Sequence, residues 1–305
     1  MPTHRSPQPK TARDDVSCFA GSPFLSFAGN NVCKHYPDSD VAVEYAKAQA
    51  IAGIVSREAQ CDTPRPLRLC EEDGRIEFSF LPSQHSLAYE YAHFLRDPST
   101  DSQFLTLVDR AAHLLASIHC QLDLPTRSQF DAPVAFDAAA RFGRFAFPHR
   151  QFEKSPRAFL HCDFGFANLA CAKDRRSEAT TLIIYDPSPN DHSTFAPDQY
   201  GSIYLDIGCF FASLNGRFPL RHQIAAKWTR VEDAKRRFAD AYAASSGHNV
   251  DLELAESVGY ATAFASFTKW RGNGWRRRIG MTLLYNRFKQ NTNWMNLPGK
   301  YHDAA

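Results

Sequence analysis

The stretch FLHCDFGFANLAC, from Phe159 to Cys171, places a histidine, an aspartate and an asparagine at fixed spacing between two apolar runs. The pattern is H-x-D-x-x-x-x-N, formed by His161, Asp163 and Asn168. The runs RAFL before it and NLAC after it are short and β-prone, which predicts a polar loop between two strands. We therefore treat these three residues as candidates for a catalytic site.

The same stretch contains the letters D-F-G at positions 163–165, a triplet that holds magnesium in protein kinases. That interpretation requires a catalytic aspartate a short distance upstream, followed five residues later by an asparagine. Residues 141–158, RFGRFAFPHRQFEKSPRA, contain neither aspartate nor asparagine. We conclude that the triplet is a coincidence inside the longer pattern.

Two further aspartates follow the loop. Asp186 ends the apolar run TLIIYD, which predicts a strand that pairs with the preceding one through the polar turn KDRRSEA. Asp206 lies in GSIYLDIGCFFASL, where it is predicted to open an amphipathic helix. Oxygen ligands suit magnesium, so Asn168 and Asp186 are candidate metal ligands.

Taken together, FLHCDFGFANLAC, TLIIYDPSPN and GSIYLDIGCFFASL resemble the aminoglycoside phosphotransferases and related small-molecule kinases. Their pattern is H-G-D-x-x-x-x-N, then I-D at a strand end, then D-x-A or D-x-G on a helix. The segment LLASIHCQLDLP resembles the Leu-His ending of the helix before their catalytic loop. The resemblance runs from about Phe19 to about Leu214 and is weak beyond. It implies an α+β, protein-kinase-like fold with a small antiparallel β N-lobe and a larger, mostly helical C-lobe.

The resemblance also implies a role for each residue of the motif. Asp163 would accept or orient the proton of a substrate hydroxyl as the catalytic base, while Asn168 and Asp186 would bind Mg²⁺. His161 and Asp206 would support the catalytic loop, the latter by accepting hydrogen bonds from loop N–H groups. An ordinary aspartate in the first turn of a helix is an equally good interpretation of Asp206.

The front of the chain would supply the residues that bind ATP. Lys34 in NNVCKHY and Glu44 in VAVEYAKAQ have the order and separation of the lysine that binds the phosphates and the helix glutamate that holds it. Alternatively, Lys34 is a solubilising charge on an edge strand and Glu44 a solvated helix residue. Gly21 and Ser22 would cover the phosphates in a poor glycine-rich loop, since a proline follows them. Backbone groups of residues 80–83 would hold the adenine.

Sequence patterns also predict the elements of each lobe. β-Prone runs broken by turns over residues 16–36, and a hairpin over residues 66–82 with its turn at 71–74, indicate antiparallel strands. Helical periodicity indicates helices over 86–96 and 104–122, and everything from Tyr200 onward is predicted to be helical apart from turns. A further helix is predicted with an apolar face formed by Val41, Ala42, Tyr45, Ala48, Ala52 and Val55. The expected domains are a disordered tail (1–13), a nucleotide-binding lobe (14–82) and a catalytic and acceptor-binding lobe (83–305).

Length and composition limit the class of protein. The chain has 305 residues, enough for two lobes. Its eight cysteines include no C-x-x-C pair, so neither a zinc site nor a disulfide framework is indicated. No window approaches the roughly 18 apolar residues of a membrane span, and MPTHRSPQPKTARDD lacks the apolar segment of a secretory signal. We therefore expect a cytoplasmic protein without a membrane span.

Positive charge gathers at the back of the chain. Residues 211–305 hold 15 Lys and Arg against 7 Asp and Glu, and include KWRGNGWRRR at 269–278. Aromatic residues among arginines are found in nucleic-acid or phospholipid surfaces, but a solvated helix end is the simpler interpretation, so we expect no nucleic-acid partner. A polycationic acceptor would be repelled, which favours a neutral or anionic small molecule with a hydroxyl group.

Three alternatives remain at this point. The same site could phosphorylate a protein, although Gly165 stands where protein kinases usually carry a lysine. The chain could be a kinase-like binding protein without activity, since the glycine-rich loop is poor, although all four metal and base positions are filled. Cys162 is a separate departure, because it replaces the usual glycine of the motif. Finally, His161 and Asp163 with His222 and Arg230 imitate the site of an iron- and 2-oxoglutarate-dependent oxygenase, which would require a β-jelly roll.

Overall fold

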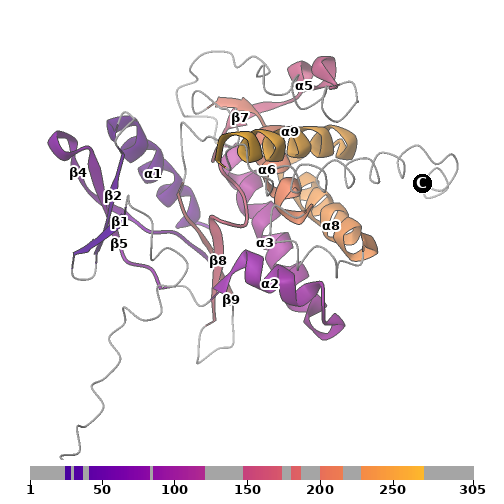
Figure 1. Ribbon diagram of the computed structural model, residues 1–305, viewed down its shortest axis with the longest axis horizontal. Helices are drawn as coiled ribbons and strands as arrows, with labels where there is room; N and C mark the ends of the chain where they lie inside the picture. The colour runs from indigo at the N-terminus through magenta and orange to yellow at the C-terminus, as the bar shows by residue number, and fades with distance from the viewer. Residues whose placement is uncertain are drawn as a thin grey trace, which may run out of the picture.

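A four-stranded antiparallel sheet and one helix form the N-terminal lobe of the molecule (Figure 1). The computed structural model describes residues 25–28, 31–36, 41–82, 85–120, 147–173, 180–186, 200–215 and 228–270. The strands follow the order β1-β2-β5-β4, so β2 and β5 are the inner strands. Their bounds are Leu25–Ala28 for β1, Asn31–His35 for β2, Pro66–Cys70 for β4 and Arg75–Ser79 for β5.

The predicted hairpin over residues 66–82 is confirmed by β4 and β5. A 3₁₀ turn, Glu71–Asp73, joins the strands and ends at Gly74, whose φ of 57° lies in the left-handed region. Glycine adopts this conformation without the steric cost that a Cβ atom imposes, and its N–H donates to Glu71 O at 3.0 Å. Local sequence therefore determines this part of the sheet.

Helix α1, Val41–Val55, confirms the predicted helix, but only half of its expected apolar face is buried. Val41, Ala48 and Val55 are buried as expected. Ala42 is exposed, and Tyr45 and Ala52 are only half-buried. Glu44 and Lys47 lie on the buried face instead, at 2% and 0% exposure. The helix is rotated so that these two charged side chains point inward, while Ile51, Ile54 and Val55 join the main hydrophobic core.

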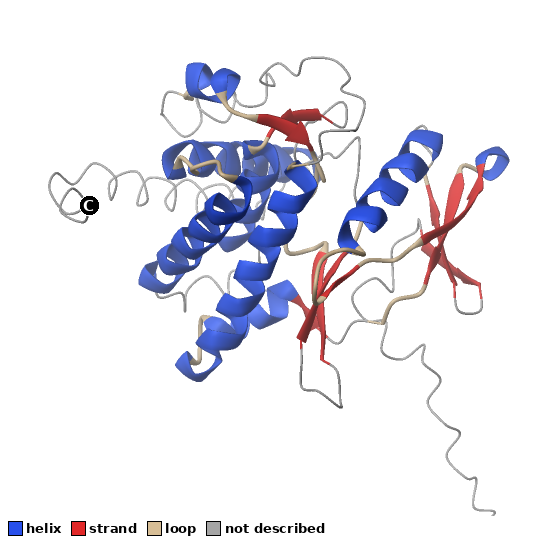
Figure 2. Ribbon diagram, turned by 180° about the vertical axis from the view of Figure 1, so that it is seen from behind, coloured by secondary structure: helices blue, strands red, loops and turns tan. Residues whose placement is uncertain are grey.

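Helices build the C-terminal lobe, as predicted, and Figure 2 shows them gathered on one side of the molecule. Ser86 begins α2 by accepting a hydrogen bond from the Tyr89 N–H, the geometry of an N-cap. Helices α6 and α9 pack closely because Gly208 and Gly259 face each other at their contact. The helices are α2 (Leu87–Phe94), α3 (Asp101–His119), α5 (His149–Lys154), α6 (Tyr204–Leu214), α8 (Trp228–Ser246) and α9 (Leu252–Trp270), with a 3₁₀ turn at Pro98–Thr100.

The prediction that Asp206 opens an amphipathic helix is wrong in one respect. Every residue of α6 is buried, including Asp206. A helix that is buried on all sides lies in the centre of a domain and needs no polar face. Helices α8 and α9 both contact α6, which leaves it without a solvent face.

Two small sheets complete the described fold. The second four-stranded sheet, of order β3-β9-β8-β6, lies between the two lobes (Figure 1). A two-stranded sheet pairs β7 with β10, so Tyr200–Ser202 is a strand and the prediction of helix from Tyr200 is wrong there. The bounds are Cys61–Asp62 for β3, His85–Ser86 for β6, Arg157–Phe159 for β7, Leu169–Lys173 for β8 and Thr180–Ile184 for β9.

Strand β3 pairs with a strand from the other side of the expected lobe boundary at residue 82. It belongs to the first 82 residues, yet Cys61 and Asp62 pair in parallel with Leu182 and Ile183 of β9. The division at residue 82 stays a prediction. Within the described residues, no helix is both long and apolar enough to cross a membrane.

Candidate active site

The predicted H-x-D-x-x-x-x-N residues form a loop between β7 and β8 (residues 160–168), here called the catalytic loop after the role predicted for it. The strands predicted on both sides are confirmed. Two backbone hydrogen bonds fold the loop on itself: the Gly165 N–H donates to Asp163 O at 2.8 Å, and the Asn168 N–H donates to Gly165 O at 2.9 Å. This fold brings the side chains of Asp163 and Asn168 together.

Both carboxylate oxygens of Asp163 are held by neighbouring side chains. Asn168 Nδ2 donates to Oδ2 at 2.7 Å, and the same amide nitrogen donates to Asp163 O at 3.1 Å. The thiol of Cys209, on α6, donates to Oδ1 at 3.5 Å. Asp163 is half-buried, so its carboxylate is oriented by protein contacts while the residue stays partly exposed to solvent.

His161 is fully buried beneath the loop, and both ring nitrogens have partners. Nε2 lies 3.1 Å from Tyr185 O, and Nδ1 lies 3.3 Å from the Asp163 backbone nitrogen. Since a carbonyl oxygen only accepts, Nε2 carries the hydrogen and Nδ1 accepts from the Asp163 N–H. Burial lowers the pKa of His161 to about 4, against the opposing charge of Asp206 and with the help of Lys47. The ring is therefore neutral near pH 7.

Asp206 binds the backbone of the catalytic loop from α6. Its Oδ2 accepts from the His161 N–H at 2.7 Å, and its Oδ1 accepts from the Cys162 N–H at 2.8 Å. These are the hydrogen bonds that the resemblance implies. Burial by itself raises the pKa of this carboxyl, but the hydrogen bond and charge of His119, with the charge of Lys47, hold it below its ordinary value.

The contact of His119 extends this network to α8. Its Nε2 lies 3.2 Å from Asp206 Oδ2, and the hydroxyl of Tyr242 lies 2.8 Å from its Nδ1. All three side chains are buried. Three helices, α3, α6 and α8, therefore fix the carboxylate that in turn fixes the loop.

Cys162 occupies a position that favours glycine. Its φ of 74° lies in the left-handed region, which costs a residue with a Cβ atom about 1–2 kcal/mol. The resemblance places a glycine there, and the backbone conformation supplies the physical reason. In this chain the two hydrogen bonds of Asp206 to the loop backbone stabilise the strained peptide.

Asn168 and Asp186 lie at the same end of the sheet between the lobes. Leu169 pairs with Ile184 in the β8–β9 ladder, and the Tyr185 N–H donates to Asn168 O at 2.8 Å. Among the described residues, the Asn168 side chain forms its hydrogen bonds through the amide nitrogen Nδ2, which donates to Asp163. The amide oxygen of Asn168 and the carboxylate of Asp186 are oxygen groups, the kind of ligand that Mg²⁺ prefers, so their assignment as metal ligands stays a prediction.

Lys34 forms an ion pair with Asp186, which joins the N-terminal sheet to this end of β9. It lies on β2 between Leu25 of β1 and Ile76 of β5. The alternative of a solubilising charge on an edge strand is wrong, because β2 is an inner strand. The Lys34 ammonium also lies 4.6 Å from the centre of the Tyr36 ring.

Glu44 is not the solvated helix residue of the alternative interpretation, because it is only 2% exposed. Burial raises the pKa of the Tyr36 hydroxyl, and the nearby charge of Glu44 raises it further. The pairing of Glu44 with Lys34 stays a prediction.

Gly21 and Ser22 lie outside the described residues. In the expected adenine-binding segment, Leu81 O accepts from the Tyr185 hydroxyl at 3.2 Å.

Sequence reasoning missed two residues of this site, Lys47 and Cys209. Lys47 Nζ donates to His161 O at 3.0 Å. A signal existed, since Lys47 lies three residues after Glu44 and therefore on the same side of α1. Cys209 had no such signal, because a cysteine in an apolar helix is ordinarily a small buried side chain.

The oxygenase alternative is wrong, because the fold is not a jelly roll. Arg230 lies on α8, where its guanidinium group stacks 4.3 Å from the centre of the Phe94 ring and forms an ion pair with Asp101. His222 lies outside the described residues. Arg230 thus stabilises the C-terminal lobe.

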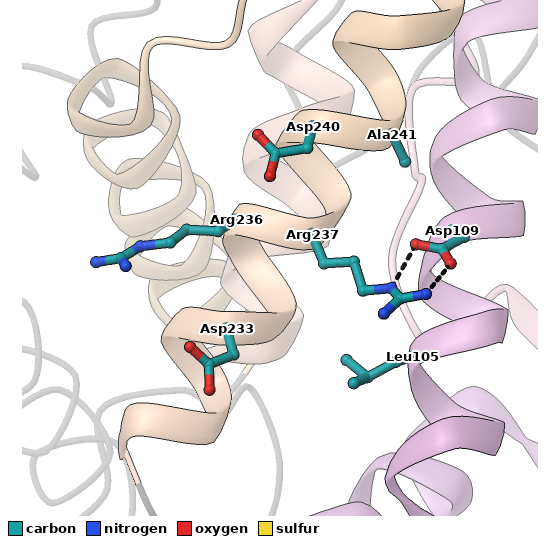
Figure 3. A pocket seen from close by; sticks show the side chains of 7 residues that line it. All are labelled: Leu105, Asp109, Asp233, Arg236, Arg237, Asp240 and Ala241. Carbon is teal, nitrogen blue, oxygen red and sulfur yellow. Dashed lines mark hydrogen bonds and ion pairs between the residues drawn. The ribbon is translucent and has the colours of Figure 1, made fainter. Parts of the chain in front are cut away.

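A separate pocket lies between α3 and α8 (Figure 3), and no predicted site residue lines it. Arg237 forms a bidentate ion pair with Asp109 across it, at 2.5 and 2.7 Å. Leu105 and Ala241 supply its apolar lining, while Asp233, Arg236 and Asp240 contribute further charge. This alternation of charges is typical of a solvated helix surface.

Comparison with known proteins places the fold. No protein-family model and no curated protein matches this chain. Among solved structures, a glucosamine kinase (crystal form B) matches with a TM-score of 0.51 and 15% identity, over 88% of this chain and 74% of that one. The GDP complex of aminoglycoside 2'-phosphotransferase-IIIa matches with a TM-score of 0.50 and 13% identity, over 86% and 87%. The chain therefore has the two-lobed α+β, protein-kinase-like fold that these small-molecule phosphotransferases share.

Proposed function

We propose that this protein is an ATP- and Mg²⁺-dependent phosphotransferase that transfers the γ-phosphoryl group to a hydroxyl of a small molecule. One observation carries the proposal. A half-buried carboxylate, Asp163, is oriented through both oxygens by Asn168 and Cys209. A general base needs such fixed orientation and access to the hydroxyl whose proton it accepts.

His161 is not the proposed base. Both ring nitrogens of His161 are occupied by the hydrogen bonds to Tyr185 O and from the Asp163 N–H. His161 therefore orients the backbone of Asp163, while Asp206 holds the preceding peptides. Asp163 accepts the hydroxyl proton as the acceptor oxygen bonds to the γ-phosphorus of ATP, while the bond from that phosphorus to the β,γ-bridging oxygen breaks and ADP leaves.

Lys34 and Asp186 form the proposed nucleotide side of the site. The Lys34 ammonium would bind phosphate oxygens of ATP, with Glu44 holding it in place. Asn168 and Asp186 would hold Mg²⁺, which when bound neutralises negative charge on the phosphates. In the described structure Lys34 instead neutralises Asp186. Nucleotide binding must therefore exchange this ion pair for contacts of each side chain with the ligand.

The acceptor is proposed to be a small molecule, and we expect it to be neutral or anionic. The solved structures of the same fold carry the names of kinases for glucosamine and aminoglycosides, which supports a small-molecule acceptor over a protein. The excess of Lys and Arg after residue 210 argues against a polycation. The identity of the acceptor requires a substrate screen.

Thermal unfolding with ATP, with and without Mg²⁺, tests the nucleotide site. At a ligand concentration of 100 times Kd, binding stabilises the folded state by about 2.7 kcal/mol, a shift of several degrees. Asp186→Ala should lose the Mg²⁺-dependent part of this shift, whereas Asp233→Ala, an exposed residue of α8, should keep it. The proposal is overturned if wild type gains no stability at millimolar ATP with Mg²⁺.

Transfer itself is tested by ADP release with neutral, anionic and cationic polyols and amino sugars. Asp163→Ala should lower the rate about 100-fold or more, the range that general-base catalysis contributes, and should keep the ATP-induced thermal shift. If Asp163→Ala turned over as fast as wild type, Asp163 would not be the base. ATP binding without transfer to any acceptor would favour a kinase-like binding protein.

A further inference from the structure

Lys47 is a buried lysine to which the proposed function assigns no role. It lies on α1 with 0% exposure, three residues after the equally buried Glu44. Lysine is rarely buried this completely because removing an ammonium group from water is costly unless polar partners replace the water. A fully buried lysine next to a candidate active site therefore requires an explanation.

The contacts of Lys47 lead from the N-terminal lobe to the catalytic loop. Its ammonium group donates to His161 O at 3.0 Å, within the protein interior. It also lies 5.8 Å from the centre of the Phe159 ring, at the end of β7. Helix α1 thus contacts the start of the catalytic loop through a charged hydrogen bond, which is stronger than a bond between neutral groups.

This contact completes the hydrogen bonding of His161. Its N–H donates to the carboxylate of Asp206, and its carbonyl accepts from the ammonium of Lys47. Its ring binds Tyr185 O and the Asp163 N–H. The peptide groups around His161 are therefore held between a negative and a positive side chain, and this residue directly orients the backbone of Asp163.

We propose that Lys47 is a positioning residue for phosphoryl transfer, which fixes the catalytic loop relative to α1. The inference rests on the proposed function. Helix α1 contacts the loop through Lys47. In the proposed function Glu44 of the same helix holds Lys34, so this one helix would set the separation between Lys34 and Asp163. Displacement of a reacting group by about 1 Å can cost 100-fold in rate, so loss of this contact should affect turnover.

The test compares Lys47→Met with Lys235→Met. Lys235 is a matched control because it is also buried, at 1% exposure, but its ion pairs within the described residues are with Glu232 and Glu256 of α8 and α9. In acceptor-free ATP hydrolysis, Lys47→Met should lower kcat at least 10-fold and change the KM for ATP less than 3-fold. Lys235→Met should keep the kcat of wild type despite lower stability.

Amide hydrogen exchange gives a readout that does not need activity. Lys47→Met should accelerate exchange in residues 161–168 at least 10-fold relative to Lys235→Met. If Lys47→Met does not fold, Lys47→Gln, which keeps a donor without the charge, takes its place. Equal exchange and equal kcat in the two variants would overturn the inference. A wild type without ATP hydrolysis and without a Mg²⁺-dependent thermal shift would overturn the proposed function, while exchange would still test Lys47.

Discussion

Acidification should destabilise this protein through His161 in a defined pH window. Its pKa is about 4 in the folded state, and an unfolded chain restores the ordinary value of about 6.5. Between these values the unfolded state binds a proton that the folded state does not, so the free energy of unfolding falls as pH decreases. A difference of roughly 2.5 pKa units corresponds to about 3 kcal/mol.

The physical origin of this effect lies in the groups around the ring. Burial is the largest cause, and the charge of Lys47 acts in the same direction, while Asp206 and Asp163 favour the protonated ring. Protonation would also place a hydrogen on Nδ1, which now accepts from the Asp163 N–H at 3.3 Å. The protonated ring would thus lose its hydrogen bond to the catalytic loop.

Urea unfolding at pH 7.5 and pH 4.5, followed by circular dichroism, measures this contribution in wild type, His161→Gln and His248→Gln. Glutamine does not titrate, so the stability advantage of wild type over His161→Gln should shrink by about 2–3 kcal/mol at the lower pH. His248 is exposed, so its variant should follow wild type at both values. A stability difference between wild type and His161→Gln that is independent of pH would refute the assignment of a neutral, buried His161.

Further predictions concern packing and the catalytic-loop network. Gly259→Ala should destabilise the protein by about 1–3 kcal/mol, because its Cβ would lie 2.8 Å from Gly208 O and 3.2 Å from Ala212 N, both backbone atoms. Gly53 is exposed on α1, and a Cβ atom added there would have no neighbouring atom within 4 Å. Gly53→Ala should therefore stabilise the protein by about 0.5–1 kcal/mol. Thermal unfolding checks both, and shifts of the same sign would contradict this account of the α6–α9 contact. Asp206→Asn places an amide donor against the loop N–H groups and should cost about 3 kcal/mol in urea unfolding. A loss as small as that of the exposed control Asp240→Asn would show that these hydrogen bonds contribute little.

Local sequence was sufficient to predict much of the fold. Apolar runs on both sides of His161, Asp163 and Asn168 predicted β7 and β8, because strand formation and loop polarity are encoded within a few residues. The turn ending in Gly74 predicted its hairpin in the same way, since glycine alone adopts a positive φ without steric cost. The order of Asp163, Asn168, Asp186 and Asp206 along these elements was therefore informative about the site.

Tertiary structure decided which side chains enter the site and which helix faces are buried. Helical periodicity predicted α1 but not which of its sides is buried, because Glu44 and Lys47 are buried by tertiary packing, Lys47 against the carbonyl of His161. Helix α6 was predicted to be amphipathic, but its contacts with α8 and α9 leave it without a solvent face. The contacts of His119 with Asp206 and of Cys209 with Asp163 join residues 87 and 46 positions apart. The sequence alone thus determined the catalytic pattern and its local elements, whereas packing between distant segments determined how those residues are oriented, because such contacts depend on the whole fold.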